Sequence, residues 1–204
     1  MIAIIDYQAG NIGSIKNMLH KLGAEADITG DPDTIRRASK IILPGVGSFD
    51  YGVTKLSESG VTEVLQERKQ ANIPILGICL GAQLMCNRSE EGKLPGLSWI
   101  DADVIRFSNQ VGDKKYSVPH IGWDLVKPVK SSRLFENLPE PSRFYFVHSY
   151  FISCHNPGDS LANNFYGNSF DSAFEAGNIA GVQFHPEKSH KFGNLLLKNF
   201  VEKF

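Results

Sequence analysis

The residues best suited to covalent chemistry are a cysteine between two glycines and a histidine–carboxylate pair much later in the chain. Cys79 lies in the sequence Gly-Ile-Cys-Leu-Gly at 77–81, directly after an apolar stretch. Glycines permit a sharp turn from a strand into a helix, which presents the thiol where the helix dipole favours a thiolate. The pattern predicts a nucleophile elbow whose Leu80 N–H can donate to an oxyanion. Taken alone, the segment also fits a buried cysteine in an ordinary turn.

The histidine–carboxylate pair follows an apolar strand in the sequence Phe-His-Pro-Glu at 184–187. His185 can take the thiol proton, and Glu187 can hold the imidazole in the required tautomer. Pro186 stiffens the chain between them. A surface histidine beside a surface glutamate is an ordinary alternative, but the pair and the elbow together favour an activated cysteine nucleophile.

A second glycine-rich loop, Pro-Gly-Val-Gly-Ser-Phe at 44–49, follows another apolar strand. Glycines let the backbone approach a ligand and turn N–H groups toward it, so this loop is a candidate for the rest of an oxyanion site. A phosphate-binding loop is excluded because its Gly-x-x-x-x-Gly-Lys-Ser/Thr pattern is absent. A tight connection without function is the alternative.

Alternating strands and helices in the first half of the chain must position these loops. The hydrophobic spacing predicts strands at 2–6, 24–29, 40–43 and 73–78 and helices at 11–22, 31–38, 61–70 and 80–87. This rhythm indicates a parallel sheet covered on both faces, with ligands at the carboxyl ends of its strands. Further strands are predicted at 104–107, 116–118, 142–148, 150–154, 170–175 and 179–184, and a closing helix at 192–204. We therefore expect an α/β fold in one domain, 1–204, with a mixed sheet that is parallel first and antiparallel later.

The composition limits which classes of partner and which cellular compartment can be expected for this protein. The 204 residues carry 21 Lys plus Arg against 22 Asp plus Glu, which gives no electrostatic case for nucleic acid. No apolar run approaches a membrane span, and the first residues lack the basic start of a signal peptide. The three cysteines form no Cys-x-x-Cys pair and the histidines no metal-ligand spacing. We expect a cytoplasmic protein without metal or cofactor.

Taken together, the motifs resemble a known family. The segments 77–83 and 184–187 resemble the class I glutamine amidotransferases. The segments 6–11, 44–49, 119–123, 145–150 and 185–189 are similar to those of the glutaminase subunits of imidazole glycerol phosphate synthase. The resemblance runs from residue 1 to 204 and implies a three-layer α/β/α, flavodoxin-like fold.

The resemblance also implies a reaction. Cys79 would attack the side-chain amide of glutamine, with His185 as base and then acid and Glu187 orienting the imidazole. A glutamyl thioester would form, and water would hydrolyse it. The residues implied for the oxyanion site and for glutamine binding are Gly45, Val46, Gly47, Leu80, Gln83, Ser149 and Tyr150.

The family further implies a partner, a (β/α)8-barrel cyclase subunit that forms a heterodimer with the glutaminase and receives the ammonia through the interface. The cyclase makes imidazole glycerol phosphate and an aminoimidazole-carboxamide ribonucleotide. Asn11, Tyr145 and Lys188 match positions that the family places at this interface. A dry passage keeps ammonia neutral and therefore nucleophilic.

Three departures from the family pattern keep alternatives open. Gln8-Ala9, Ala82 and Asp124 replace more usual residues. A paralogous glutaminase that supplies a cyclase-like partner amidating a surface-polysaccharide sugar is one alternative, which the segment 188–193 favours. A cysteine peptidase or deglycase of similar fold is another, although it would not require Gln83, Ser149 and Tyr150 around the thiol. A silent regulatory subunit is a third, and the intact triad argues against it.

Overall fold

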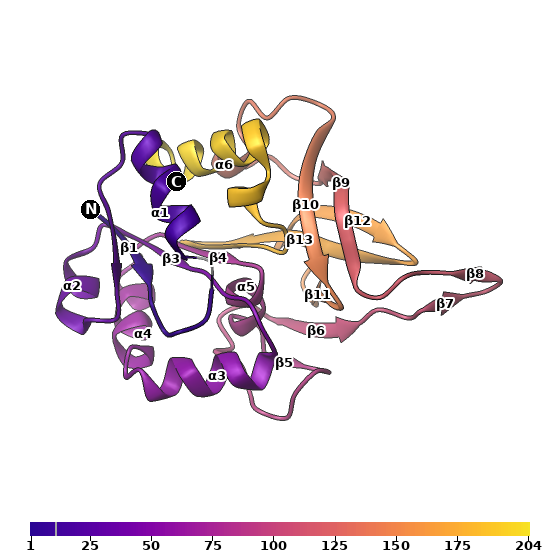
Figure 1. Cartoon of the computed structure of the whole chain (residues 1–204), viewed down its shortest axis with the longest axis horizontal. Helices are drawn as coiled ribbons and strands as arrows, with labels where there is room; N and C mark the ends of the chain where they lie inside the picture. Colours follow the sequence, from indigo (N-terminus) through magenta and orange to yellow (C-terminus); the bar gives the residue numbers. More distant parts are fainter. Residues whose placement is uncertain (11) are drawn as a thin grey trace.

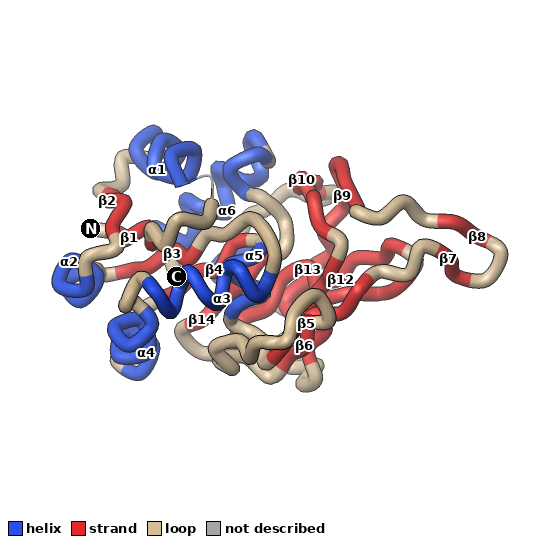
Figure 2. Tube along the Cα trace, turned by 60° about the horizontal axis from the view of Figure 1, so that its bottom comes forward, coloured by secondary structure: helices blue, strands red, loops and turns tan. Residues whose placement is uncertain are grey.

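Parallel strands form one half of a large sheet in a computed structural model that describes residues 1–10 and 12–204. Their order is β2-β1-β3-β4-β14 (Figures 1 and 2). Their bounds are Ile2–Ile5 for β1, Ala26–Thr29 for β2, Lys40–Leu43 for β3, Ile75–Ile78 for β4 and Ile179–Val182 for β14. Every residue of β1, β4 and β14 is buried, as expected for strands covered on both faces.

Helices cover both faces of the parallel half (Figures 1 and 2). On one face lie α1 (Ile12–Lys21) and α6 (His190–Glu202), and on the other α2 (Pro32–Arg37), α3 (Phe49–Glu58), α4 (Thr62–Gln70) and α5 (Leu80–Leu84). The side chains of neighbouring residues in β3 pack in two different hydrophobic clusters, one on each face of the sheet. Ile41 packs in the same cluster as Leu56 of α3, and Ile42 packs in the same cluster as Leu196 of α6. The predicted three-layer fold is therefore confirmed.

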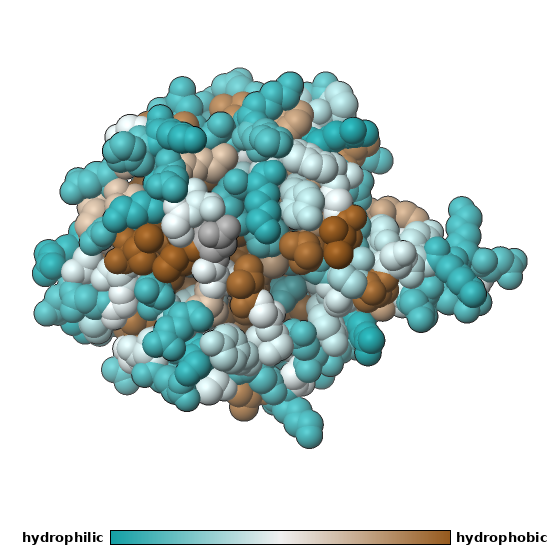
Figure 3. All heavy atoms as spheres, in the orientation of Figure 1, coloured by the Kyte–Doolittle hydropathy of each residue, from teal (hydrophilic) through white to brown (hydrophobic). Residues whose placement is uncertain are grey.

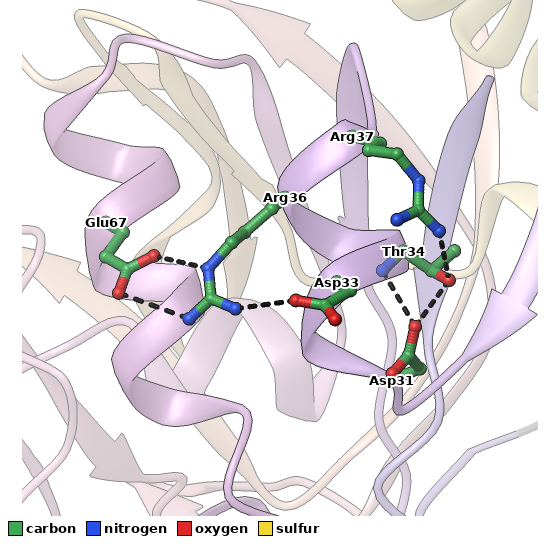
Figure 4. Close-up of polar contacts among 6 residues, drawn as sticks. All are labelled: Asp31, Asp33, Thr34, Arg36, Arg37 and Glu67. Atoms are coloured by element: carbon green, nitrogen blue, oxygen red, sulfur yellow. Dashed lines mark hydrogen bonds and ion pairs between the residues drawn. The ribbon is translucent and has the colours of Figure 1, made fainter.

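The short helix α2 has a complete N-terminal cap and a polar link to α4 (Figure 4). Asp31 accepts a hydrogen bond from the backbone N of Thr34 at 2.8 Å. Arg36 reaches Asp33 within α2 at 2.9 Å and Glu67 on α4 at 3.0 Å. Because exposed ion pairs contribute little to stability, these contacts orient α2 more than they hold the fold together.

Antiparallel strands form the other half of the sheet. Beyond β14 the order continues through β13 (Asn168–Ala176), β12 (Ser160–Tyr166), β9 (His120–Pro128) and β10 (Ser142–His148). Off this path, β11 (Tyr150–Cys154) pairs with β13 and β6 (Ala102–Arg106), and β6 pairs with β5 (Arg88–Ser89). The hairpin of β7 (Gln110–Val111) and β8 (Lys114–Lys115) projects from the body (Figure 1), and two single turns complete the elements, η1 (Arg133–Phe135) and η2 (Pro186–Lys188).

The mixed sheet is as predicted, but several elements are not. Helix α3 was not expected, although Phe49, Val53 and Leu56 have helical spacing, because Gly52 interrupts the pattern. Strands β9 and β12 were also missed, since they contain residues with low strand propensity, such as Gly122 and the Asn163-Asn164 pair. The strand predicted at 116–118 is wrong: pairing resumes only after Pro119, which has no N–H to donate. None of the helices in the described ranges is long and apolar enough to cross a membrane.

Candidate active site

The nucleophile elbow predicted around Cys79 is present between β4 and α5. Cys79 has φ 53° and ψ −114°, a conformation that non-glycine residues rarely adopt. Its backbone N donates to Val182 O on β14 at 2.8 Å, and Gln83 N donates to its carbonyl at 3.1 Å, which starts α5. Strained backbone of this kind costs on the order of 1–3 kcal/mol and clusters at functional sites. The turn therefore holds Cys79 at the carboxyl edge of the sheet.

The glycines of the elbow and of the loop after β3 allow these two segments to touch. A Cβ added to Gly81 would overlap the carbonyl oxygen of Leu43, and one added to Gly45 would lie 2.8 Å from Gly81 N. A Cβ on Gly77 would lie 2.7 Å from the Cα of Ala82. These distances are too short for any larger residue. Gly45 and Gly81 are thus required for the close approach of the 44–48 loop to the nucleophile, and Gly77 for the sharp turn into α5.

His185 and Glu187 form a buried pair directly after β14. Their Nδ1 and Oε1 atoms are 2.7 Å apart, and both side chains are almost completely buried, at 2% and 3% exposure. Burial disfavours the imidazolium, but contacts with the Cys79 and Glu187 side chains outweigh it and raise the pKa of His185 to about 10. Because Glu187 occupies Nδ1, the other ring nitrogen remains available for proton transfer; Nε2 has no hydrogen-bond partner among the described residues.

A pocket of about 320 Å³ opens over the elbow. It brings together most of the residues predicted for the site. Its lining residues are Val46, Gly47, Cys79, Leu80, Gln83, Glu91, Pro119, Val147, His148, Ser149, Tyr150, His185 and Lys188. The volume suits a small polar molecule, and the pocket contains both an acidic and a basic side chain.

Three of the predicted residues that the structure describes lie outside this lining. Gly45 sits behind the pocket, against Gly81, and Glu187 lies behind His185. The side chain of Tyr145 stands beside Lys188, whose Nζ is 5.7 Å from its ring. Asn11 falls outside the residues that the structure describes.

Tyr145 belongs to a largely exposed face of β9 and β10. It is the cross-strand partner of Trp123, with ring centroids 6.2 Å apart, and Ile121 pairs with Val147. Trp123 and Ile121 are 43% and 58% exposed. The molecular surface carries its most hydrophobic residues in a band across the middle of the view, whereas the projecting hairpin is mostly hydrophilic (Figure 3).

Three further residues near the nucleophile were not predicted to belong to the site. The Tyr7 hydroxyl donates to Pro44 O at 2.7 Å, and burial together with Cys79 raises the pKa of that hydroxyl well above its usual range. Glu91 accepts from Phe49 N at 2.8 Å and so fixes the start of α3 beside the pocket. Gln183 lies under Cys79. Tyr7 is part of the 6–11 motif, but no local pattern marks Glu91 or Gln183.

Two buried histidines support the pocket wall from the antiparallel half. His120 Nδ1 lies 3.1 Å from His148 Nε2, and His148 Nδ1 lies 2.8 Å from the carbonyl oxygen of Tyr150. Burial lowers the pKa of His148 to about 3. A neutral His148 therefore holds the backbone of Tyr150 in place. Among the described residues, no group of three His, Cys, Asp or Glu side chains is arranged to hold a metal ion.

Comparisons with known proteins agree with this geometry. The family model "Glutamine amidotransferase class-I" matches residues 3–204. The chain is 52% identical over 204 residues to the imidazole glycerol phosphate synthase subunit HisH 2 of Methanococcus maripaludis, with both chains fully covered. It is 48% identical to the HisH subunit of Bdellovibrio bacteriovorus, covering 99% of this chain and 100% of that one. A solved glutamine amidotransferase shares the fold, with a TM-score of 0.76, 20% identity and coverage of 99% and 98%.

Proposed function

Because the chain belongs to the class I glutamine amidotransferases and is about half identical to HisH subunits, we propose that it hydrolyses glutamine as the glutaminase subunit of imidazole glycerol phosphate synthase. In this role it serves histidine biosynthesis. The proposed functional unit is one domain, 1–204, which acts in the cytoplasm.

The first chemical step is acylation of Cys79. With the pKa of His185 at about 10, its ring carries a proton at neutral pH beside the cysteine sulfur. The thiolate attacks the side-chain carbonyl carbon of glutamine, and the carbonyl electron pair moves to oxygen. His185 Nε2 then gives its proton to the departing nitrogen, so that ammonia leaves and a glutamyl thioester remains.

Backbone N–H groups stabilise the oxyanion in this proposal. Leu80 N precedes the first hydrogen bond of α5, and Val46 and Gly47 line the pocket opposite it. Each donor aimed at the oxyanion contributes on the order of 3 kcal/mol to lowering the barrier. The hydrogen bond from Tyr7 to Pro44 anchors the base of the 44–48 loop.

The remaining pocket residues hold the amino-acid end of glutamine. Glu91 offers a negative charge for the α-ammonium group, and Ser149 and Tyr150 offer backbone groups for the α-carboxylate. The oxygen of the Gln83 amide is left for the substrate, since both of its hydrogens already donate within the protein. The pocket thus matches a zwitterionic amino acid with an amide side chain.

The partner in this proposal is a (β/α)8-barrel cyclase subunit that docks on the exposed face of β9 and β10. Tyr145 and Lys188 lie together on this side, and Lys188 also lines the pocket, so one residue can contact both substrate site and partner. Asn11 is proposed for the same interface from the sequence. Ammonia passes to the cyclase without entering solvent, where protonation would make it unreactive.

The observation that carries the proposal is the buried His185–Glu187 pair beside a strained Cys79, at a small pocket that also contains Glu91 and Lys188. The test uses glutamine labelled with 15N in its amide, supplied to the heterodimer together with excess unlabelled ammonium. We expect the imidazole product to contain 15N. Product that contains only unlabelled nitrogen would contradict the channelled glutaminase reaction.

A further inference from the structure

Gln183 is a completely buried amide beside the Cys79 nucleophile. It directly follows β14, and only Phe184 separates it from His185 in the sequence. Its side chain has 0% exposure, and its backbone N donates to Ser172 O at 2.9 Å. A buried amide is costly unless its donors and acceptor are paired, so the partners of Gln183 indicate what it does.

The hydrogen-bond network fixes which end of this amide faces the cysteine. The carbonyl of Tyr150 can only accept, so Gln83 presents Nε2 to it, at 3.1 Å. The same Nε2 donates its second hydrogen to Oε1 of Gln183 at 3.0 Å. Oε1 of Gln183 is therefore the acceptor end, and its Nε2 points to Cys79 Sγ at 3.8 Å.

The anchor of this network is itself held rigidly. The Tyr150 carbonyl also accepts from His148 Nδ1, at 2.8 Å, and His148 is braced by His120. Since His148 donates through Nδ1, its Nε2 must accept from Nδ1–H of His120. Two strands of the antiparallel half thus fix Tyr150, and Tyr150 and Gln83 in turn fix the orientation of the Gln183 amide.

We propose that Gln183 is a further catalytic residue, whose amide N–H donates a hydrogen bond to the Cys79 thiolate. This inference rests on the proposed glutaminase reaction. The donor favours the charged sulfur over the neutral thiol before attack. The same donor acts again in deacylation. Water adds to the thioester carbonyl and gives its proton to His185. The C–S bond then breaks, and the sulfur departs with the electron pair as a thiolate, which again accepts a hydrogen bond from the Gln183 amide.

The test measures the rate at which iodoacetamide alkylates Cys79 as a function of pH. The variant Gln183→Met keeps the size of the side chain and removes the donor. We expect the midpoint of the alkylation profile to move up by about one pH unit, with a rate about tenfold lower at pH values below both midpoints. Gln183→Leu should behave alike. Cys79→Ala supplies the background, because burial raises the pKa of both other thiols, Cys86 and Cys154.

A matched control is Asn199→Leu. Asn199 is also a buried amide, 1% exposed, and donates to Leu134 O and Glu136 O far along the chain from the elbow. Its loss should reduce stability and leave the alkylation midpoint unchanged. If Asn199→Leu shifts the midpoint as much as Gln183→Met does, or if folded Gln183 variants keep the wild-type midpoint, the proposal is wrong.

A second measurement needs no substitution at 183. The side-chain amide protons of Gln183, assigned by their contacts with Gln83, should shift in NMR spectra when the Cys79 thiol is deprotonated. Protons that stay in place through that titration would overturn the proposal. Neither readout depends on glutamine turnover, so a wild-type chain that fails to hydrolyse glutamine would instead count against the proposed function.

Discussion

In the parallel half of the molecule, the loops after β3, β4 and β14 are fixed by close contacts, whereas the antiparallel half presents an open face with exposed apolar side chains. Gly45 and Gly81 lie against each other at one edge, and His185 and Glu187 are buried beside them. Trp123 and Ile121 on β9, by contrast, are 43% and 58% exposed. In the proposed function, the parallel half performs the chemistry, and the antiparallel half binds the amino-acid end of the substrate and the partner.

The largest effect expected from this division comes from removing the nucleophile. Cys79→Ala should lower glutamine hydrolysis on the order of 10⁴-fold or more, because no other group in the pocket can form the thioester. The same variant should bind the cyclase normally, since the face of β9 and β10 is unaltered. Glutamate release and titration of the two subunits check both halves of the comparison. Retained hydrolysis would contradict the mechanism.

Adding a methyl group at Gly81 should disrupt the packing between the elbow and the loop after β3. Its Cβ would overlap Leu43 O, so we expect Gly81→Ala to lower the free energy of unfolding by about 3 kcal/mol, as overpacking does. Gly13, in α1, has no atom within 4 Å of an added Cβ apart from its chain neighbours and the backbone of its own helix. Gly13→Ala should therefore stabilise the protein by up to about 1 kcal/mol, through helix propensity. Equal denaturant midpoints for the two variants would refute the packing argument.

Neutralising the buried carboxylate should have an intermediate effect. We expect Glu187→Gln to lower kcat about 10²- to 10³-fold, because the imidazole loses its orienting partner. Glu187 is one of the groups that raise the pKa of His185, so His185 loses its proton at a lower pH in the variant. The alkaline loss of activity, expected near pH 10 in the wild type, should accordingly move to lower pH.

The control for this variant is a pair with the same geometry on the surface. His155 Nδ1 lies 2.8 Å from Asp101 Oδ1, but both side chains are about half exposed or more. Asp101→Asn should leave kcat and the pH profile as they are. A similar loss in both variants would show that the burial of His185 and Glu187 has no special role.

The smallest effect is expected on the partner-facing side. Lys188→Ala removes the cation beside Tyr145. We expect a roughly fivefold fall in the ratio of glutamine hydrolysis with the cyclase and its ribonucleotide to hydrolysis by the isolated chain. Lys55, 5.9 Å from the ring of Tyr51 on α3, has the same type of contact away from β9 and β10. Lys55→Ala should leave the ratio unaltered. An unchanged ratio in Lys188→Ala would remove this residue from the interface.

The two halves also differed in how far the sequence predicted them. In the parallel half, the strand at 40–43 has the predicted bounds, and the elbow follows β4 as expected, because buried apolar runs and glycine turns are local signals. In the antiparallel half, the strands at 142–148 and 150–154 also have the predicted bounds, but β9 and β12 were missed because residues such as Gly122 and the Asn163-Asn164 pair have low strand propensity. Gln183 was missed for another reason, since its role follows from contacts with Gln83 and Cys79, about a hundred residues away along the chain.

The most direct test of the central claim is glutamate release from glutamine by the isolated chain and by its mixture with the cyclase subunit of the same genome. Each is measured with and without the phosphoribulosyl aminoimidazole-carboxamide ribonucleotide that the cyclase uses. We expect little release from the chain alone and at least roughly tenfold activation when both cyclase and ribonucleotide are present. No activation by the ribonucleotide, while Cys79 still reacts with a glutamine-analogue inhibitor, would contradict the histidine-pathway role and point to the sugar-amidating paralogue.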